Sequence, residues 1–362
     1  MKAKYFDFGR FREFRAKREE DLADFLIGKS KSNVFLKEVA FENFYACRNR
    51  DESLDLQLDA ITRHMKLKSG NIPYLEPWFG VGVYANAFGA EYIWSPEGVK
   101  ESPQTHYVAH SEEDVEKLPE PDIQKSPIMR MIIDAIDYFV EQTNGEIPVC
   151  VTDTQSPIDN ATLVWDTSSF FLSMCTNPEF VHKFLDKITR LTIEFTDEQI
   201  RHLGETWARP GHIMLSSTRG SGIALSDDNI VMLSPEHYSE FAVKYNEVIA
   251  SRYGGLAIHS CGNYRNQLDA LLSTKGLVMI DGAFSLECDP TPNSDFEQFR
   301  DRLKGRGVIL QARMGEDWRE ILPRLYHPDM KIVISVPPPK QGEPADKNIV
   351  ELDRIISKIE IG

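Results

Sequence analysis

The chain has 362 residues, of which 41% are hydrophobic and 27% are charged, and its formal net charge is -15. This composition is typical of a globular protein. The acidic excess opposes binding to nucleic acid, because neutralising phosphates requires clustered Lys and Arg. The first residues lack the apolar core of a signal peptide, and no run of about 18 apolar residues occurs. We therefore expect a cytoplasmic protein that binds neither nucleic acid nor membranes.

Five cysteines are scattered along the chain: Cys47, Cys150, Cys175, Cys261 and Cys288. An odd number of widely spaced cysteines does not predict a disulfide framework, so reduced thiols are expected. Cys150 ends the run "IPVC" and Cys175 lies in "FLSMC", which favours small buried side chains for these two.

The first 70 residues are charged and have a helical pattern. The stretches "FREFRAKREEDLADFLIG" and "LDLQLDAITRHMKL" place apolar residues three and four positions apart, which predicts amphipathic helices. We expect residues 1–70 to form an N-terminal helical segment packed on a larger domain of residues 71–362. Residues 71–94 are rich in aromatic residues, Gly and Pro, which is typical of loops and short strands.

From about Pro127, amphipathic helical stretches alternate with short apolar stretches. The expected strands are "IPVCVTD", "HIMLSS", "LAIHSC", "LVMIDGA", "VILQAR" and "KIVISV". Such alternation predicts an α/β fold with a parallel sheet and helices outside. The early Gly-rich region and "NIVML" would bring the count to eight, so we expect one closed TIM-type (β/α)8 barrel. A doubly wound open sheet is the alternative, but its Gly-rich fingerprint after the first strand is missing.

Helix starts agree with this division of the chain. Ser126, Asn177 and Ser234 each precede a proline, which is the usual arrangement of a capping residue before Pro at the first helical position. A final helix is expected from about Lys347.

His259 and Cys261 stand two apart at the end of the strand-like run "LAIHSC". Alternate residues of a strand point to the same face, and barrel active sites lie at the carboxyl ends of the strands. Imidazole and thiolate are common zinc ligands, and catalytic zinc uses three protein ligands. Cys288, in the loop "FSLECDP" after the next strand, is the expected third ligand, with Glu287 as the alternative.

A metal held in this way has two uses, which the residues alone leave open. It could activate water for hydrolysis, or it could bind a substrate thiol as thiolate and make it nucleophilic at neutral pH.

Other side chains are candidates for the same site. Asp153 and Gln155 follow the strand-like "IPVCV" and could bind a polar group or cap the next helix. Asp228, next to Asp227 in "ALSDDNI", could shape the site or stand in an exposed loop. Arg219, in a Gly-rich loop, could clamp an anion.

Two aromatic residues and one amide complete the set of candidates. Tyr74 and Trp78 belong to an aromatic run that also contains Phe79, Tyr84 and Phe88. This run is either core or a wall for a flat ligand. Asn263 directly follows the His-x-Cys-Gly sequence and is a candidate ligand-binding residue.

Three stretches carry a family resemblance: "YGGLAIHSCGNYRNQLDALL", "SPEHYSEFAVKYNEVIA" and "NPEFVHKFLDKITRLTIEFTDEQI". They resemble the uroporphyrinogen decarboxylase superfamily, and more closely its branch of zinc-dependent methylcobamide:thiol methyltransferases. The resemblance implies a TIM-type barrel in which His259 and Cys261 bind Zn2+. It also implies a methylcobamide carried by a partner corrinoid protein, a small-molecule methyl acceptor, and a homodimer as one option.

The sequence departs from the superfamily patterns in two places. The decarboxylases carry an Arg-rich N-terminal segment of the type R-Q-A-G-R, which is missing here, so tetrapyrrole decarboxylation is not expected. The coenzyme M enzymes carry a late Cys, and the corresponding "VISVPPPKQGEPADKN" has none. Cys288 or Glu287 would then complete the zinc site, and the acceptor need not be coenzyme M.

The first hypothesis is a zinc-dependent methyltransferase of a corrinoid pathway. The alternatives are a metal-dependent decarboxylase or lyase acting on a small acid, and a non-catalytic barrel that binds a corrinoid or tetrapyrrole.

Overall fold

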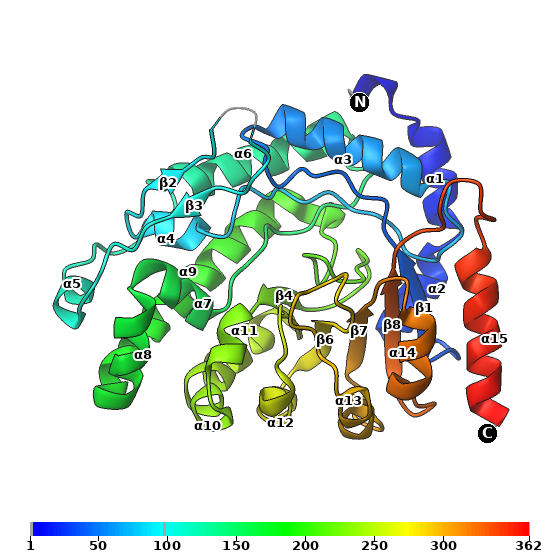
Figure 1. The fold of residues 1–362 in the computed structure, drawn as a ribbon. Coiled ribbons are helices and arrows are strands. Elements are labelled where there is room, and N and C mark those ends of the chain that lie inside the picture. Colours follow the sequence, from blue (N-terminus) through cyan, green and yellow to red (C-terminus); the bar gives the residue numbers. More distant parts are fainter. Residues whose placement is uncertain (1–2, 97–98, 362) are drawn as a thin grey trace.

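A computed structural model describes residues 3–96 and 99–361. Its main feature is a six-stranded parallel sheet in the order β1-β8-β7-β6-β5-β4 (Figure 1). The strands are β1 Val34–Glu38, β4 Ile223–Ser226, β5 Leu256–His259, β6 Leu277–Ala283, β7 Ile309–Arg313 and β8 Lys331–Val336. A separate antiparallel pair is formed by β2 Tyr92–Ile93 and β3 Gln104–Thr105.

Helices cover the outside of the sheet. Figure 1 shows α11 to α14 following the outer side of the strands in chain order, while α3 and α6 lie together at another side of the molecule. The helices are α1 Phe8–Ala16, α2 Glu19–Leu26, α3 Arg50–His64, α4 Val83–Ala87, α5 Glu112–Glu116, α6 Pro127–Gln142, α7 Pro157–Val164, α8 Thr167–Thr176, α9 Pro178–Leu203, α10 Pro235–Tyr238, α11 Lys244–Tyr253, α12 Leu268–Leu272, α13 Phe296–Leu303, α14 Trp318–Leu325 and α15 Lys347–Ile361. Within the described residues, no helix is both long and apolar enough to span a membrane.

The predicted parallel α/β fold is confirmed, and so are the expected strands β5 to β8 and the final helix α15. The expected capping is confirmed at two sites: the Ser126 hydroxyl accepts from the Met129 N–H at the start of α6, and Ser234 accepts from the His237 N–H at α10. A π-helical turn, Ser239–Val243, joins α10 to α11. The helix predicted before β5 is therefore continuous.

One expected strand, residues 147–153, is reduced to isolated bridges at Val149, and two others are wrong. Residues 212–217 form a tight turn, because Gly211 and Ile213 have φ angles of 108° and 43° and the chain folds back so that Arg209 pairs with Ser217. Residues 229–232 belong to a short 3-10 helix, Asp228–Met232, and not to a strand. The strand between these segments is β4, whose four residues are all buried.

The parallel strands do not close into a barrel in this structure. Single bridges continue the sheet beyond β4: Gln155 pairs with Ser226, and Val149 pairs with Leu75. In the described part of the chain, no backbone hydrogen bond joins Leu75 and its neighbours to β1. The Asn71 side chain spans this seam instead, donating to the Glu38 carbonyl at 2.9 Å and accepting from the Glu38 N–H at 3.2 Å. The seam is a break in the ring of strands.

Residues 1–70 are only partly as expected. The helices α1, α2 and α3 are present, but Val34–Glu38 forms strand β1 and pairs in parallel with β8. The prediction of an entirely helical segment is therefore wrong for these five residues, whose central Leu36 is buried. The division of the chain at residue 70 stays a prediction.

The aromatic run after residue 74 is mainly core. Phe79, Tyr84 and Phe88 are at most 2% exposed, and Trp78 packs in a small separate cluster with Phe44. Among the cysteines, Cys150 is buried as expected. The expectation is wrong for Cys175, which is exposed because it lies on the solvent side of α8.

Candidate metal centre

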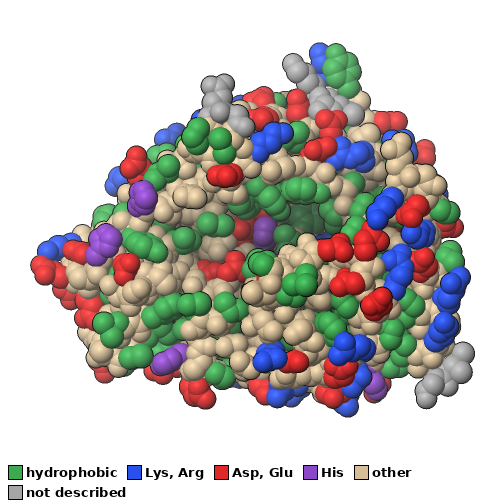
Figure 2. All heavy atoms as spheres, in the orientation of Figure 1, with side chains coloured by type: hydrophobic (Ala, Val, Ile, Leu, Met, Phe, Trp, Pro, Cys, Tyr) green, Lys and Arg blue, Asp and Glu red, His purple; other side chains and the backbone are tan. Residues whose placement is uncertain are grey.

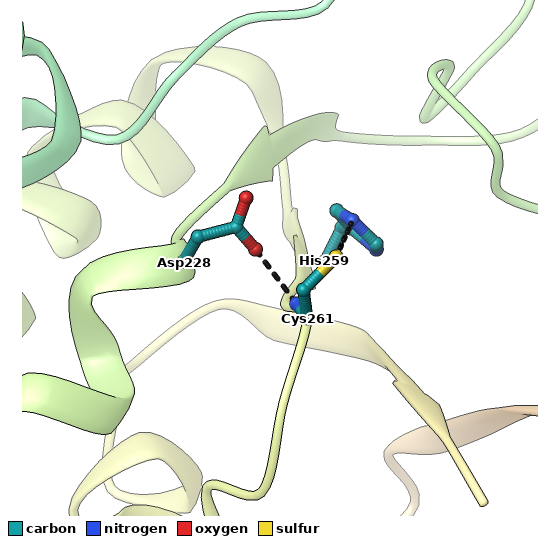
Figure 3. A group of neighbouring side chains, drawn as sticks. All are labelled: Asp228, His259 and Cys261. Carbon is teal, nitrogen blue, oxygen red and sulfur yellow. Dashed lines mark hydrogen bonds between the residues drawn. The ribbon is translucent and has the colours of Figure 1, made fainter. Parts of the chain in front are cut away.

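Two neighbouring strands bring three metal-ligating side chains together. Strand β4 ends at Ser226, which is in register with His259 at the end of β5, so the residues that follow the two strands lie at the same edge of the sheet. Asp228, His259 and Cys261 each offer a ligand atom there, and these atoms lie within 4.8 Å of one another. Figure 3 shows the Asp228 carboxylate directed to the Cys261 backbone nitrogen and the Cys261 sulfur directed to the His259 ring.

His259 is held with one ring nitrogen free for a metal. Its Nδ1 lies 2.8 Å from Asp281 Oδ2, and its Nε2 lies 3.7 Å from the Cys261 sulfur. Tetrahedral zinc with ordinary Zn–N and Zn–S bonds places these two ligand atoms about 3.6 Å apart. The nitrogen and sulfur therefore already stand at the separation that one zinc ion requires.

Asp281 is the anchor of this arrangement. It is fully buried and also accepts from Arg313 Nε and from Gln311 Nε2, each at 2.8 Å. Burial alone would raise the pKa of Asp281, but Arg313 and His259 outweigh burial and hold the pKa well below its ordinary range. A carboxylate on the second imidazole nitrogen fixes the tautomer and strengthens the imidazole as a ligand.

Cys261 is exposed, and its thiol is protonated at neutral pH when no metal is bound. Its sulfur is partly buried against His259, and this partial burial together with the nearby Asp228 raises its pKa to about 11, although Arg313 lowers it in part. A cysteine becomes a metal ligand as the thiolate, so metal binding here would displace a proton. The Cys261 N–H donates to Asp228 Oδ1 at 2.6 Å, which fixes the carboxylate against the loop.

A second carboxylate positions Asp228. Asp159, on α7, accepts hydrogen bonds from the N–H groups of Asp228 and Asn229 at 2.6 and 3.0 Å. Burial and the neighbouring carboxylates raise the pKa of Asp159 well above its ordinary value. Burial also raises the pKa of Asp227 to about 6. Three carboxyl groups are thus crowded beside the site, which favours a nearby cation.

The residues predicted as third ligand lie elsewhere. In the described part of the chain, neither Cys288 nor Glu287 belongs to the group of converging ligand atoms. Glu287 accepts from the Glu316 N–H at 3.4 Å, and the Cys288 N–H donates to the Ser285 carbonyl, so the chain turns at these two residues. Asp228 takes this place in the geometry.

Asp153 and its predicted neighbours form a second polar cluster. Asp153 accepts from Ser226 Oγ at 2.6 Å, from Gln155 Nε2 at 2.9 Å and from Trp78 Nε1 at 3.4 Å. Its carboxylate is therefore directed into the interior, and the alternative of a helix cap is not what the structure shows. Ser156 caps α7 instead.

Sequence reasoning missed two residues of this second cluster, Glu76 and His212. His212 Nδ1 lies 2.6 Å from Glu76 Oε1, and its Nε2 lies 3.7 Å from Asp153 Oδ1. The His212 ring stands edge-on to His259 with centroids 5.8 Å apart. Glu76 is 136 residues from His212 in the sequence, so no local pattern connects them.

His212 should make stability depend on pH. Burial alone would lower its pKa, but Asp153 and Glu76 raise it to about 9. A raised pKa in the folded state contributes stability below the ordinary pKa near 6.5, and this contribution is lost as the pH rises through about 9. For metal-free protein we expect His212→Gln to unfold at lower urea concentration at pH 6, by roughly 3 kcal/mol, and to approach wild type at pH 10. The exposed His106→Gln is the control. Equal stability of wild type and H212Q at pH 6 would contradict this.

The structure places the remaining predicted residues at differing distances from the site. Tyr74 lines an adjacent cavity and donates to the carbonyls of Gly211 and Met214. The Asn263 side chain donates to the Pro292 carbonyl at 3.3 Å and so supports a loop. Arg219 precedes β4 at the opposite edge of the sheet, 3.9 Å from Glu20, and is not brought to the site.

Comparisons with known proteins agree with the resemblance. Residues 44–206 match the family described as uroporphyrinogen decarboxylase (URO-D). The uroporphyrinogen decarboxylase of Alcanivorax borkumensis is 23% identical over 253 residues, which cover 67% of this chain and 61% of that enzyme. The chain therefore aligns with less than two thirds of that relative. A solved methyltransferase from Methanosarcina mazei has the same fold, with a TM-score of 0.64 and 15% identity over 94% of this chain and 98% of that chain.

These matches confirm the predicted resemblance to the superfamily. The family match ends at residue 206, before His259 and Cys261. The support for a metal centre therefore comes from the geometry of this chain and not from the family match.

Proposed function

We propose that this chain is a zinc-dependent methyltransferase of the uroporphyrinogen decarboxylase superfamily. It would move a methyl group between a methylated corrinoid carried by a partner protein and a small acceptor activated by zinc. Support comes from the fold shared with a methyltransferase and from the sequence match to the family.

The observation that carries the proposal is the converging donor set of Asp228, His259 and Cys261. One nitrogen, one sulfur and one oxygen ligand suit zinc, and three protein ligands leave the fourth position for a substrate. Bound zinc would lower the pKa of an acceptor group and make it nucleophilic at neutral pH.

The residues around the donor set have separate tasks. Asp281 holds His259 Nδ1 and leaves Nε2 to the metal. Arg313 favours the thiolate of Cys261, because it lowers the pKa that burial and Asp228 raise. Asp159 fixes the backbone of Asp228. Together these contacts orient the ligands before the metal binds, which reduces the cost of ordering them.

The proposal includes a TIM-type barrel and a docking face. The bridges from β4 through Gln155 and Val149 to Leu75 follow the course of further barrel strands.

A partner corrinoid protein would approach the edge that carries the metal centre. Two exposed apolar side chains stand in the loops after β4 and β6 at that edge, Met232 at 65% and Leu286 at 75% exposure, and would suit contact with a protein.

Zinc content and methyl transfer test the proposal. We expect one zinc per chain in freshly purified protein, none in His259→Ala, and demethylation of methylcobalamin by wild type with one of a panel of thiols or tetrahydrofolate. A loss of methylcobalamin absorbance that requires both zinc and acceptor is the supporting result. Wild-type protein without bound zinc would refute the proposal.

A second candidate is a metal-dependent decarboxylase or lyase acting on a small acid. It is favoured by the match of residues 44–206 to the decarboxylase family. It predicts bound zinc without demethylation of methylcobalamin, and release of carbon dioxide or an alkene from an acid substrate, so the same preparation separates the two candidates.

A further inference from the structure

A cavity of about 340 Å3 lies at the seam between β1 and the segment around Leu75. Its lining comes from β1 and the loop after it, from α3, from residues 71–76, from the turn at residues 213–216, and from Arg313 and Ser335. Figure 2 shows a hollow with hydrophobic walls and charged groups at its rim on the viewed face of the molecule. The size is that of an ordinary small-molecule site. Arg313 connects the cavity to the metal centre, since it also binds Asp281 and the Ser260 carbonyl.

Lys37 is a buried cation in this cavity without an anionic partner. Its side chain is directed to the Ile213 carbonyl and, at 3.5 Å, to Gln311 Oε1, which are both neutral acceptors. Among the described residues, no carboxylate lies within ion-pair distance of Lys37. Asp281, the nearby carboxylate, is already paired with Arg313. A buried charge is costly unless it is paired.

The carboxylates that line the cavity are already paired. Glu76 binds His212 at 2.6 Å and Glu42 binds Arg63 at 2.6 Å. His64 is neutral at pH 7, because burial lowers its pKa to about 4. The cavity lining formed by the described residues therefore has no free carboxylate that would neutralise the positive charge of Lys37.

The remaining walls are apolar or aromatic. The side chains that give them this character are Phe41, Phe44, Tyr45, Ile61, Ile72 and Leu215. Burial keeps the Tyr45 hydroxyl neutral by raising its pKa well above its ordinary value. Aromatic walls with a few polar groups at one end are typical of sites for flat, amphipathic molecules.

We propose that this cavity binds an aromatic carboxylic acid, with its carboxylate between Lys37 and Arg313 and its ring between Phe44, Ile61 and Ile72. The carboxylate supplies the missing anion, and the ring occupies the apolar walls. That this acid is the substrate presented to the metal centre rests on the proposed function. The binding itself depends on the cavity alone.

Calorimetric titration with 2-naphthoate and with its neutral analogue 2-naphthamide tests the binding. Because hydrogen bonds to a charged group are stronger than those between neutral groups, an acid should bind a buried cation about tenfold or more tightly than its neutral amide does. We expect 2-naphthoate to bind wild type at least about tenfold more tightly than 2-naphthamide. Lys37→Met should remove most of this preference, chiefly by weakening the binding of 2-naphthoate. Lys275→Met, which replaces an exposed lysine, should bind both compounds as wild type does.

Further variants keep the outcomes separable. Thermal unfolding checks that Lys37→Met is folded. If it is not folded, the proposal is decided by ligand binding to Lys37→Arg, which retains the charge, and by the acid–amide comparison on wild type. Equal binding of acid and amide, or full acid affinity in folded K37M, would overturn the proposal. His259→Ala should lose zinc and retain 2-naphthoate binding, so absence of zinc in wild type would refute the proposed function without touching this site.

Discussion

Replacing Asp281 by Asn is expected to destabilise the folded chain by about 3–5 kcal/mol, because it leaves a buried cation without its partner. Asp281 is fully buried and pairs with Arg313 Nε at 2.8 Å. The variant also exchanges an acceptor for an amide beside His259 Nδ1, and the loss of such a carboxylate typically lowers metal affinity by about 10–100-fold. Urea unfolding of metal-free protein measures the first effect, and competition with a zinc-binding dye measures the second.

The pH dependence of this loss has a defined sign. Although burial alone would raise the pKa of Asp281, Arg313 and His259 hold it below its ordinary value. A depressed pKa contributes stability above the ordinary pKa near about 4, and the contribution is lost as the pH falls below it. The difference between wild type and D281N should therefore be constant from about pH 5 to 7 and shrink below about pH 4.

A surface pair provides the control for Asp281. Glu297 also accepts from an arginine Nε at 2.8 Å, that of Arg324, but both side chains are about half exposed. Glu297→Gln should leave the urea midpoint unchanged, because water replaces an exposed ion pair. If D281N and E297Q unfold at the same urea concentration, the buried pair does not anchor this edge of the sheet.

The larger features of the fold follow from local patterns. Amphipathic stretches of eight or more residues specify α6, α9 and α15, and apolar runs specify β6 to β8, because each pattern is repeated over enough residues to be distinctive. Strand β4 cannot be predicted from such a local pattern. It has four residues, Ile223–Ser226, between a Gly-rich loop and an acidic loop, and only its pairing with β5 makes it a strand.

The same omission explains why the sequence predicts Cys288, and not Asp228, as the third ligand. His259 and Cys261 were predicted from a pattern within one strand end, where spacing alone places the side chains together. Asp228 becomes a neighbour of Cys261 only when β4 is known to lie beside β5. Without β4, the loop after β6 is the nearest source of a further ligand, and the sequence therefore indicates Cys288.

The pairing of Glu76 with His212 is still harder to predict from the sequence. The turn that directs His212 inward depends on the positive φ of Ile213, a conformation that β-branched residues rarely adopt. The Ile213 carbonyl accepts from Lys37 and from Gln311, so β1 and β7 hold the turn in place. Such a conformation is a property of the assembled core, not of residues 212–217.

Replacing Asp228 by Asn should lower zinc affinity by more than the roughly 10–100-fold that residues outside the ligand set contribute. The amide keeps an oxygen for the Cys261 N–H, which Asp228 Oδ1 now accepts at 2.6 Å, so the loop retains its support while the negative ligand is removed. Cys288→Ser should bind zinc as wild type does, because Cys288 is outside the converging group of described residues.

Asp289 offers a matched control for the Asp228 substitution. Its Oδ2 accepts from the Gly262 N–H at 3.1 Å, next to Cys261, but its carboxylate is outside the donor group. Asp289→Asn should therefore change zinc affinity less than D228N does, and competition with a zinc-binding dye at pH 7 ranks the variants. If C288S loses zinc while D228N retains it, the loop after β6 must move to the metal, and the ligand set predicted from the sequence would be correct. If D228N alone loses it, the ligands come from the loops after β4 and β5, and the edge of the sheet beside β6 is left for the substrate.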